Sequence, residues 1–206
     1  ADAHPEWLVV KAAGNDRGDG PAPGTGHWFI DPVTQNWSWS TAVRSLDGRG
    51  GFDSLSHQAT AKNGLVVGAV GDIVGGYAGP SSVLMTSFSV WGPCDDGRIK
   101  PDLVANGTTV YSTLAAGDAA YAEFSGTSMA APSVTGSLAL LVEHYRNTRP
   151  GLGDLGSAAV RALVIHTTDE AGPAVGPDYR FGWGLFNTLR AAQVITGDTT
   201  LEQTIG

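Results

Sequence analysis

The feature that most constrains the fold of this chain is a run of fourteen residues without a charged side chain, Met129–Val142, with the sequence MAAPSVTGSLALLV. A helix that is apolar all round is buried in a core. Pro132 would break the interior of a helix, but in the first turn its missing N–H removes no hydrogen bond. We therefore expect a buried helix that begins near Thr127 or Ser128 and continues to about Tyr145.

Ser128 lies at the expected start of this helix, within the sequence FSGTSMAAP, and two roles fit that position. The positive end of a helix favours negative charge, so it would stabilise an alkoxide or a developing oxyanion. Serine is also a preferred N-cap, because its hydroxyl accepts a hydrogen bond from a free backbone N–H. On spacing alone the cap is the commoner role, and both interpretations remain open at this point.

The other apolar segments predict an α/β fold. Leu65–Val70 is a nearly continuous apolar run, the pattern of a strand in a sheet that is covered on both faces. Strands precede helices and no internal repeat occurs, so we expect a largely parallel sheet with packed helices. The expected strands are Trp7–Ala13, Leu65–Val70, Leu84–Val90, Asp102–Ala105 and Val110–Ser112, and the expected helices are 127–145, 156–166 and 187–195.

Residues 17–58 differ from the rest of what we expect to be one domain, 1–206. Glycine is frequent there, Trp28, Trp37 and Trp39 are interspersed, and neither strand nor helix periodicity is sustained. A segment of this length without regular pattern inside a compact domain is more often a functional insertion than a linker. We therefore expect a Gly- and Trp-rich insertion.

Charge and cysteine content exclude several classes of protein. The formal net charge is 12 − 20 = −8, and no basic cluster occurs, which argues against binding to nucleic acid or to an anionic membrane surface. No run of about 18 apolar residues is present, so no membrane span is expected. Cys94 is the single cysteine, so the chain is no disulfide scaffold, and we expect Cys94 to be an inert loop residue.

Four segments carry a resemblance to a known family. Gly126–Pro132, with the sequence GTSMAAP, resembles the nucleophile signature of the subtilisin-like serine peptidases, and Ala12–Asn15 resembles the segment that carries their oxyanion-hole asparagine. Gly97–Ala105 and Gly182–Asn187 resemble two further segments of the same family. The resemblance extends from residue 8 to about residue 192, and it implies a subtilisin-like fold and serine endopeptidase activity.

The resemblance also implies roles for single residues. Ser128 would be the nucleophile, and the side-chain amide of Asn15 would donate to the oxyanion. The backbone of Ala12, Ala13 and Gly14 would form one wall of the substrate pocket. Gly126 and Thr127 would also contact the substrate.

The histidine and aspartate of the family's catalytic triad have no counterpart motif in this chain. The family places an Asp-Ser/Thr-Gly turn and then a His-Gly-Thr helix start before the asparagine, and neither occurs here. We therefore expect the C-terminal part of a catalytic domain, with its N-terminal strands missing and no activity in isolation. Two alternatives stay open: a degenerate member of the family that serves as a binding scaffold, and a plain α/β interaction module.

Two positions depart from the family's pattern, and the remaining expectations follow from the resemblance. Asn106 stands where proline is common, and Trp91 where arginine is common. No cofactor is expected for catalysis, although structural calcium is a candidate at Asp95 and Asp96. The expected partners are a protein or peptide substrate, and either the missing N-terminal part or a second copy of the chain. Without that part, the edge strand 8–13 and part of the uncharged helix are expected to be exposed and to promote such pairing. The family resemblance suggests a secreted or extracytoplasmic location.

Overall fold

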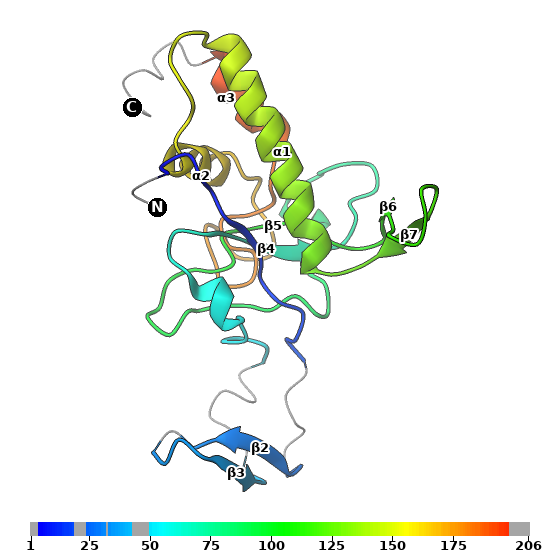
Figure 1. Ribbon diagram of the computed structural model, residues 1–206, viewed down its shortest axis with the longest axis vertical. Coiled ribbons are helices and arrows are strands. Elements are labelled where there is room, and N and C mark those ends of the chain that lie inside the picture. Colours follow the sequence, from blue (N-terminus) through cyan, green and yellow to red (C-terminus); the bar gives the residue numbers. More distant parts are fainter. Residues whose placement is uncertain (1–3, 19–23, 32, 43–49, 198–206) are drawn as a thin grey trace.

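The computed structural model describes residues 4–18, 24–31, 33–42 and 50–197. Their centre is a parallel three-stranded sheet in the order β1-β4-β5, with β1 at Val10–Ala12, β4 at Leu65–Val70 and β5 at Leu103–Asn106 (Figure 1). The expected α/β class with a parallel sheet is confirmed. Within the described part of the chain no strand pairs with the outer edge of β1.

Three helices pack around the sheet. They are α1 (Thr127–Thr148), α2 (Ser157–His166) and α3 (Thr188–Gly197), close to the expected ranges. Helix α1 crosses β1, β4 and β5 and also packs against α3 (Figure 1). Two short 3-10 helices, η1 (His57–Thr60) and η2 (Pro80–Ser82), lie in the loops. None of the helices in the described ranges is long and apolar enough to span a membrane.

The location of β4 within the sheet explains why its run of apolar residues is continuous. Leu65, Val67 and Ala69 pack in the cluster that α1 completes, whereas Val66 and Val70 belong to clusters on the opposite face. All six residues of β4 are buried. Because side chains alternate between the faces of a sheet, only a strand covered on both sides needs apolar residues at every position.

Two antiparallel hairpins stand outside the sheet. One pairs β2 (His27–Ile30) with β3 (Trp37–Ser40), and the other pairs β6 (Val110–Thr113) with β7 (Tyr121–Phe124). The first lies in the predicted insertion 17–58, of which residues 19–23, 32 and 43–49 are outside the described residues. Its tryptophans Trp28, Trp37 and Trp39 are exposed, and the hairpin lies away from the sheet (Figure 1). These side chains are therefore no part of the core.

A buried ionic network fixes the start of β5. Asp102 Oδ2 accepts hydrogen bonds from Lys100 Nζ at 2.5 Å and from the backbone N–H of Val66 at 2.6 Å, while Oδ1 accepts from Arg161 at 2.8 Å. Lys100 and Asp102 are only 1% and 2% exposed. Burial lowers the pKa of Lys100, and its hydrogen bond with Asp102 opposes this shift. Buried charges are tolerated when they are paired in this way.

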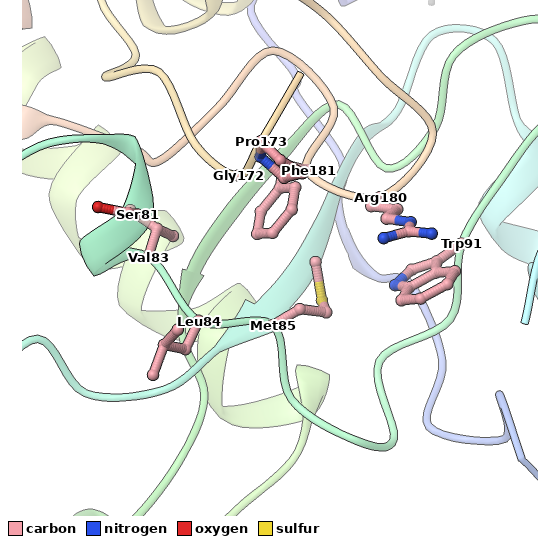
Figure 2. Close-up of a pocket in the computed structure, with 9 residues that line it drawn as sticks. All are labelled: Ser81, Val83, Leu84, Met85, Trp91, Gly172, Pro173, Arg180 and Phe181. Carbon is pink, nitrogen blue, oxygen red and sulfur yellow. The ribbon is translucent and has the colours of Figure 1, made fainter. Parts of the chain in front are cut away.

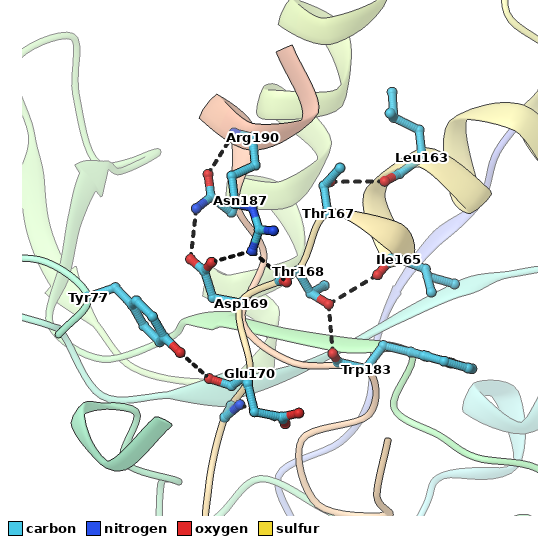
Figure 3. Close-up of polar contacts among 11 residues, drawn as sticks. Tyr77, Leu163, Ile165, Thr167, Thr168, Asp169, Glu170, Trp183, Asn187 and Arg190 are labelled. Carbon is cyan, nitrogen blue, oxygen red and sulfur yellow. Dashed lines mark hydrogen bonds and ion pairs between the residues drawn. The ribbon is translucent and has the colours of Figure 1, made fainter. Parts of the chain in front are cut away.

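The C-terminal segment closes the fold beside β5. Leu185 forms backbone hydrogen bonds with Asp169, and the next residue, Phe186, donates from its N–H to the carbonyl oxygen of Val104. The carboxylate of Asp169 accepts from Asn187 Nδ2 at 2.7 Å and from Arg190 at 2.9 Å (Figure 3). These contacts join the end of α2 to the first turn of α3.

The prediction of a strand at Leu84–Val90 is wrong. Only an isolated bridge between Met85 and Val70 forms there. Besides the backbone hydrogen bonds at this bridge, two side-chain hydroxyls bond β4: Thr86 Oγ1 donates to the carbonyl oxygen of Ala69 at 2.9 Å, and Ser89 Oγ accepts from the N–H of Ala69 at 3.0 Å. The segment runs along β4 without extending the sheet. Strands β2, β3 and β7 were not predicted.

Helix α1 is less buried than its uncharged sequence predicts. Its buried residues lie on one side and are Thr127, Ala130, Ala131, Val134, Leu138, Leu141 and Tyr145. Pro132, Ser133, Thr135 and Gly136 are exposed, and Leu140 is 62% exposed. No described residue covers that face, so an uncharged surface remains open along the helix.

Candidate active site

The loop after β1 meets the N-terminus of α1. The N–H of Ala13 donates to the carbonyl oxygen of Val67 at 3.0 Å, and the carbonyl oxygen of Gly14 accepts from the N–H of Val90 at 3.2 Å. Gly14 has a φ of 129°, a conformation that favours glycine. A Cβ there would also lie 3.3 Å from both Cγ atoms of Val90. Gly14 is therefore required by the turn that aims Asn15 at the helix.

Asn15 is bonded to the first residue of α1. Its Oδ1 accepts two hydrogen bonds, from the backbone N–H and from the hydroxyl of Thr127, both at 2.9 Å. Because a backbone N–H can only donate, the oxygen of the amide must face Thr127, and Nδ2 is left as a donor on the other side. A Cβ added to Gly126 would lie 3.4 Å from Nδ2.

Thr127 ties the loop and the helix together. Its hydroxyl accepts from the N–H of Gly14 at 3.2 Å while it donates to Asn15. The residue is only 1% exposed. One buried threonine thus fixes both the backbone and the side chain of the loop, across more than a hundred residues of sequence.

Ser128 is the second residue of α1 and is exposed. The N-cap is Gly126, whose carbonyl oxygen accepts from the N–H groups of Met129 and Ala130. The role of N-cap considered for Ser128 is therefore wrong. Because Ser128 lies in the first turn, it is at the positive end of the dipole of this 22-residue helix.

Two of the described histidines, His4 and His144, form side-chain hydrogen bonds with residues other than Ser128. His144 contacts Thr196 at 2.8 Å, and it lies sixteen residues beyond Ser128 on α1, about 24 Å along the axis at 1.5 Å per residue. His4 bonds Glu6 and stacks on Trp7. No hydrogen bond joins Ser128 to a histidine within the described ranges.

Part of the segment expected to form the substrate-pocket wall, Ala12–Gly14, makes contacts within the fold instead. The side chain of Ala13 is fully buried in a cluster with Ala59, Val66 and Val90, and its carbonyl oxygen accepts from Ser56 Oγ at 3.2 Å. Ala12 is half-buried. The roles of Ala12, Ala13, Gly14, Gly126 and Thr127 toward a substrate stay predictions.

Sequence reasoning missed Arg17, which anchors the loop two residues beyond Asn15. Its Nη2 donates to the carbonyl oxygens of Thr86 and Ser87 at 2.7 and 2.6 Å, and its guanidinium lies 4.1 Å from the ring centroid of Trp91. Nothing in the sequence pairs position 17 with these distant residues. The departure at Trp91 from the family's arginine was the available signal.

No metal centre is evident in the described part of the chain. It contains no group of three or more His, Cys, Asp or Glu side chains placed to hold an ion. Asp96 instead pairs with Arg98 at 2.7 Å, and the hydrogen bond from Arg98 lowers the pKa of Asp96. Cys94 is buried, which raises the pKa of its thiol, as suits an unreactive residue.

Comparisons with known proteins give the same family as the motifs. The model of the subtilase family matches residues 2–184. C5a peptidase of Streptococcus pyogenes is 42% identical over 72 residues, which cover 35% of this chain and 6% of that protein. Pyrolysin of Pyrococcus furiosus is 30% identical over 131 residues, covering 55% of this chain and 9% of that protein.

Solved structures agree. The CspB protease of Clostridium perfringens has a TM-score of 0.56 and 30% identity, over 71% of this chain and 30% of that one. The prenylagaramide maturation protease PagA has a TM-score of 0.58 over 94% of this chain and 52% of that one, and at 23% identity it shows the fold alone. The chain thus spans only a part of the relatives that it matches. Since the family model covers nearly all of its length, the chain belongs to the subtilase family.

Proposed function

We propose that this chain carries the nucleophile and the oxyanion hole of a serine endopeptidase, and that the aspartate and histidine of the triad lie outside it. The observation that carries the proposal is the pair of hydrogen bonds from Thr127 to Asn15 Oδ1. They leave the Nδ2 donor of Asn15 directed away from Thr127, at the start of the helix on which Ser128 is exposed.

The chemistry follows from these positions. Ser128 Oγ attacks the scissile carbonyl carbon as a histidine base takes its proton. Asn15 Nδ2 and the backbone N–H of Ser128 donate to the oxyanion of the tetrahedral intermediate, and the positive end of α1 adds to the stabilisation. The amine product leaves with a proton from the histidine, and water then hydrolyses the acyl-enzyme.

The substrate in this proposal is a protein or peptide. The backbone of Ala12, Ala13 and Gly14 lines one side of the pocket for the residue before the cut, and Gly126 and Thr127 border the scissile bond. The proposed location is secreted or extracytoplasmic. Structural calcium at Asp95 and Asp96 remains a prediction. A calcium ion there would compete with Arg98 for the carboxylate of Asp96.

A second candidate is a subtilase-fold scaffold that binds without catalysis. It is favoured by the observation that no described histidine bonds Ser128. The encoded sequence before Ala1 separates the two: an Asp-Ser/Thr-Gly turn followed by His-Gly-Thr-His favours the enzyme, whereas neither motif favours the scaffold.

Labelling with a fluorophosphonate tests the proposal. The isolated chain should not label, because Ser128 without its base is an ordinary hydroxyl. Protein that also contains the triad Asp and His should label once, and Ser128→Ala should abolish the label. Ser133→Ala, at another exposed serine of α1, is the matched control and should label normally. Efficient labelling of the isolated chain, or of Ser128→Ala, would contradict the proposal.

A further inference from the structure

Two arginines share one tryptophan and have no acidic partner. The guanidinium carbons of Arg17 and Arg180 lie 4.1 and 4.5 Å from the ring centroid of Trp91, and Arg180 also lies 5.2 Å from that of Phe52. Among the described residues, neither guanidinium forms an ion pair. After burial, the charge of Arg180 is the second cause that lowers the pKa of Arg17. In a chain with twenty acidic and twelve basic residues, this unpaired positive charge needs an explanation.

Two buried donors beside these charges also have no acceptor. They are Trp91 Nε1 and Arg17 Nη1, neither of which has a hydrogen-bond partner in the described structure. Leaving a buried donor unsatisfied costs about 1–3 kcal/mol, so native proteins rarely do it without a reason. The Arg180 guanidinium makes no hydrogen bond to any described residue. What the cluster lacks is a negatively charged acceptor.

A cavity of about 290 Å³ opens next to this cluster. Val83, Leu84, Met85 and Phe181 give it an apolar lining, and Arg180 and Trp91 stand at one end (Figure 2). Figure 2 shows the guanidinium of Arg180 beside the indole of Trp91. The ring of Phe181 lies farther from the indole, toward Val83. The volume is at the lower end for ligand pockets and suits one or two side chains.

We propose that this cavity binds a polypeptide segment in which an Asp or Glu side chain lies next to an apolar residue. The apolar side chain fills the cavity between Leu84, Met85 and Phe181, and the carboxylate accepts charge-assisted hydrogen bonds from Arg180. Charge complementarity favours this ligand, because the site has unpaired positive charge and an apolar floor. The choice of a polypeptide rests on the proposed function, whereas the charge and shape of the site do not.

The site is connected to the loop that carries Asn15. Arg17 contacts the same indole as Arg180, and its backbone N–H donates to the carbonyl oxygen of Phe88 at 3.3 Å. Val90, the neighbour of Trp91, bonds Gly14. A segment bound at Arg180 therefore lies on the same framework as the oxyanion loop, where an extended substrate could be held at a second point.

Fluorescence anisotropy tests the site without catalysis, on protein that contains this chain with Ser128→Ala. The probe is a fluorescein-labelled, carboxyl-terminally amidated peptide with the sequence Gly-Ser-Leu-Asp-Leu-Ser-Gly. Two matched peptides carry Asn in place of Asp, or Ser in place of both Leu residues. The Asp peptide should bind with a Kd about tenfold lower than either matched peptide, as expected for a charge-assisted hydrogen bond and a filled cavity.

Substitutions at Arg180 test whether this residue causes the preference for the Asp peptide. Arg180→Gln should abolish the difference between the Asp and Asn peptides, and Arg180→Lys should keep part of it. Arg146→Gln removes an equal charge from α1, where Arg146 forms an exposed ion pair with Asp154, and should leave the difference intact. Circular dichroism confirms that each variant is folded. Equal affinities of the three peptides, or a preference that survives in folded Arg180→Gln, would overturn the proposal. Because the test needs no cleavage, it can fail while the proposed catalysis holds.

Discussion

Asn15 Oδ1 accepts both the backbone N–H and the hydroxyl of Thr127 at 2.9 Å, although 112 residues separate the two in sequence. The contact orients the amide, because only its oxygen can face a backbone donor. This orientation leaves the amide nitrogen of Asn15 as a donor for the proposed oxyanion.

The hydroxyl of Thr127 should matter through Asn15. Thr127→Val keeps the shape but removes the two hydrogen bonds of the hydroxyl, which donates to Asn15 Oδ1 and accepts from the N–H of Gly14. The backbone N–H of Thr127 still donates to Asn15. In active protein we expect kcat to fall by about tenfold with little change in KM, which corresponds to about 1.4 kcal/mol of lost transition-state stabilisation. Thr127→Ser keeps the hydroxyl and should recover most of the activity. If Thr127→Ser is as impaired as Thr127→Val, the methyl group matters rather than the hydrogen bonds.

Arg17 should stabilise the fold around the loop. Arg17→Met removes two hydrogen bonds to the carbonyl oxygens of Thr86 and Ser87 and the contact with Trp91. Since Arg17 is partly exposed, we expect the free energy of unfolding to fall by about 1–2 kcal/mol. Urea denaturation measures this, with Arg146→Met as the control on an exposed ion pair. Equal denaturation midpoints for the wild type and Arg17→Met would contradict the role.

The buried ionic network should be far more sensitive to substitution than a surface pair. Asp102→Asn removes the carboxylate that pairs with Lys100 and Arg161. It leaves a buried lysine without its counter-ion, and we expect a loss of about 3–5 kcal/mol in unfolding free energy. Asp154→Asn, in the exposed pair with Arg146, should leave the urea midpoint nearly unchanged. Similar midpoints for the two variants would show that the buried pair carries no special weight.

The open edge of β1 and the uncharged face of α1 should draw a partner. Unpaired strand edges and exposed apolar surface both promote association. We therefore expect the isolated chain to associate with another copy or with a further part of its catalytic domain. Light scattering on the purified chain should give a mass above 21.2 kDa. A folded, monodisperse monomer of that mass would refute this expectation.

How much could be predicted from sequence differs between the fold and the site. The apolar run 65–70 predicts β4 and the uncharged run 129–142 predicts α1. In both cases the signal is a pattern of adjacent residues in the sequence. The segment 84–90 has the same apolar character, but Thr86 and Ser89 take over the hydrogen bonds that a strand would make. Local pattern does not distinguish these two outcomes.

The site could be predicted only through whole motifs. Asn15 and Ser128 became candidates because each lies in a segment that resembles the subtilase family, whereas no periodicity relates the two positions. The cluster of Arg17, Trp91 and Arg180 could not be assembled from the sequence, although the tryptophan at position 91 was one signal. Its members come from three distant segments, and an unpaired charge becomes visible only when the neighbours are known.

Whether Asn15 stabilises the oxyanion is measured most directly by the steady-state kinetics of Asn15→Leu, in protein that contains this chain together with the triad Asp and His. Leucine has nearly the same shape but donates no hydrogen bond to the oxyanion. We expect kcat to fall by roughly 10²–10³, the loss known for this donor within the same family, while KM changes little. An increase in KM with kcat preserved would contradict it, because Asn15 would then bind substrate without stabilising the transition state.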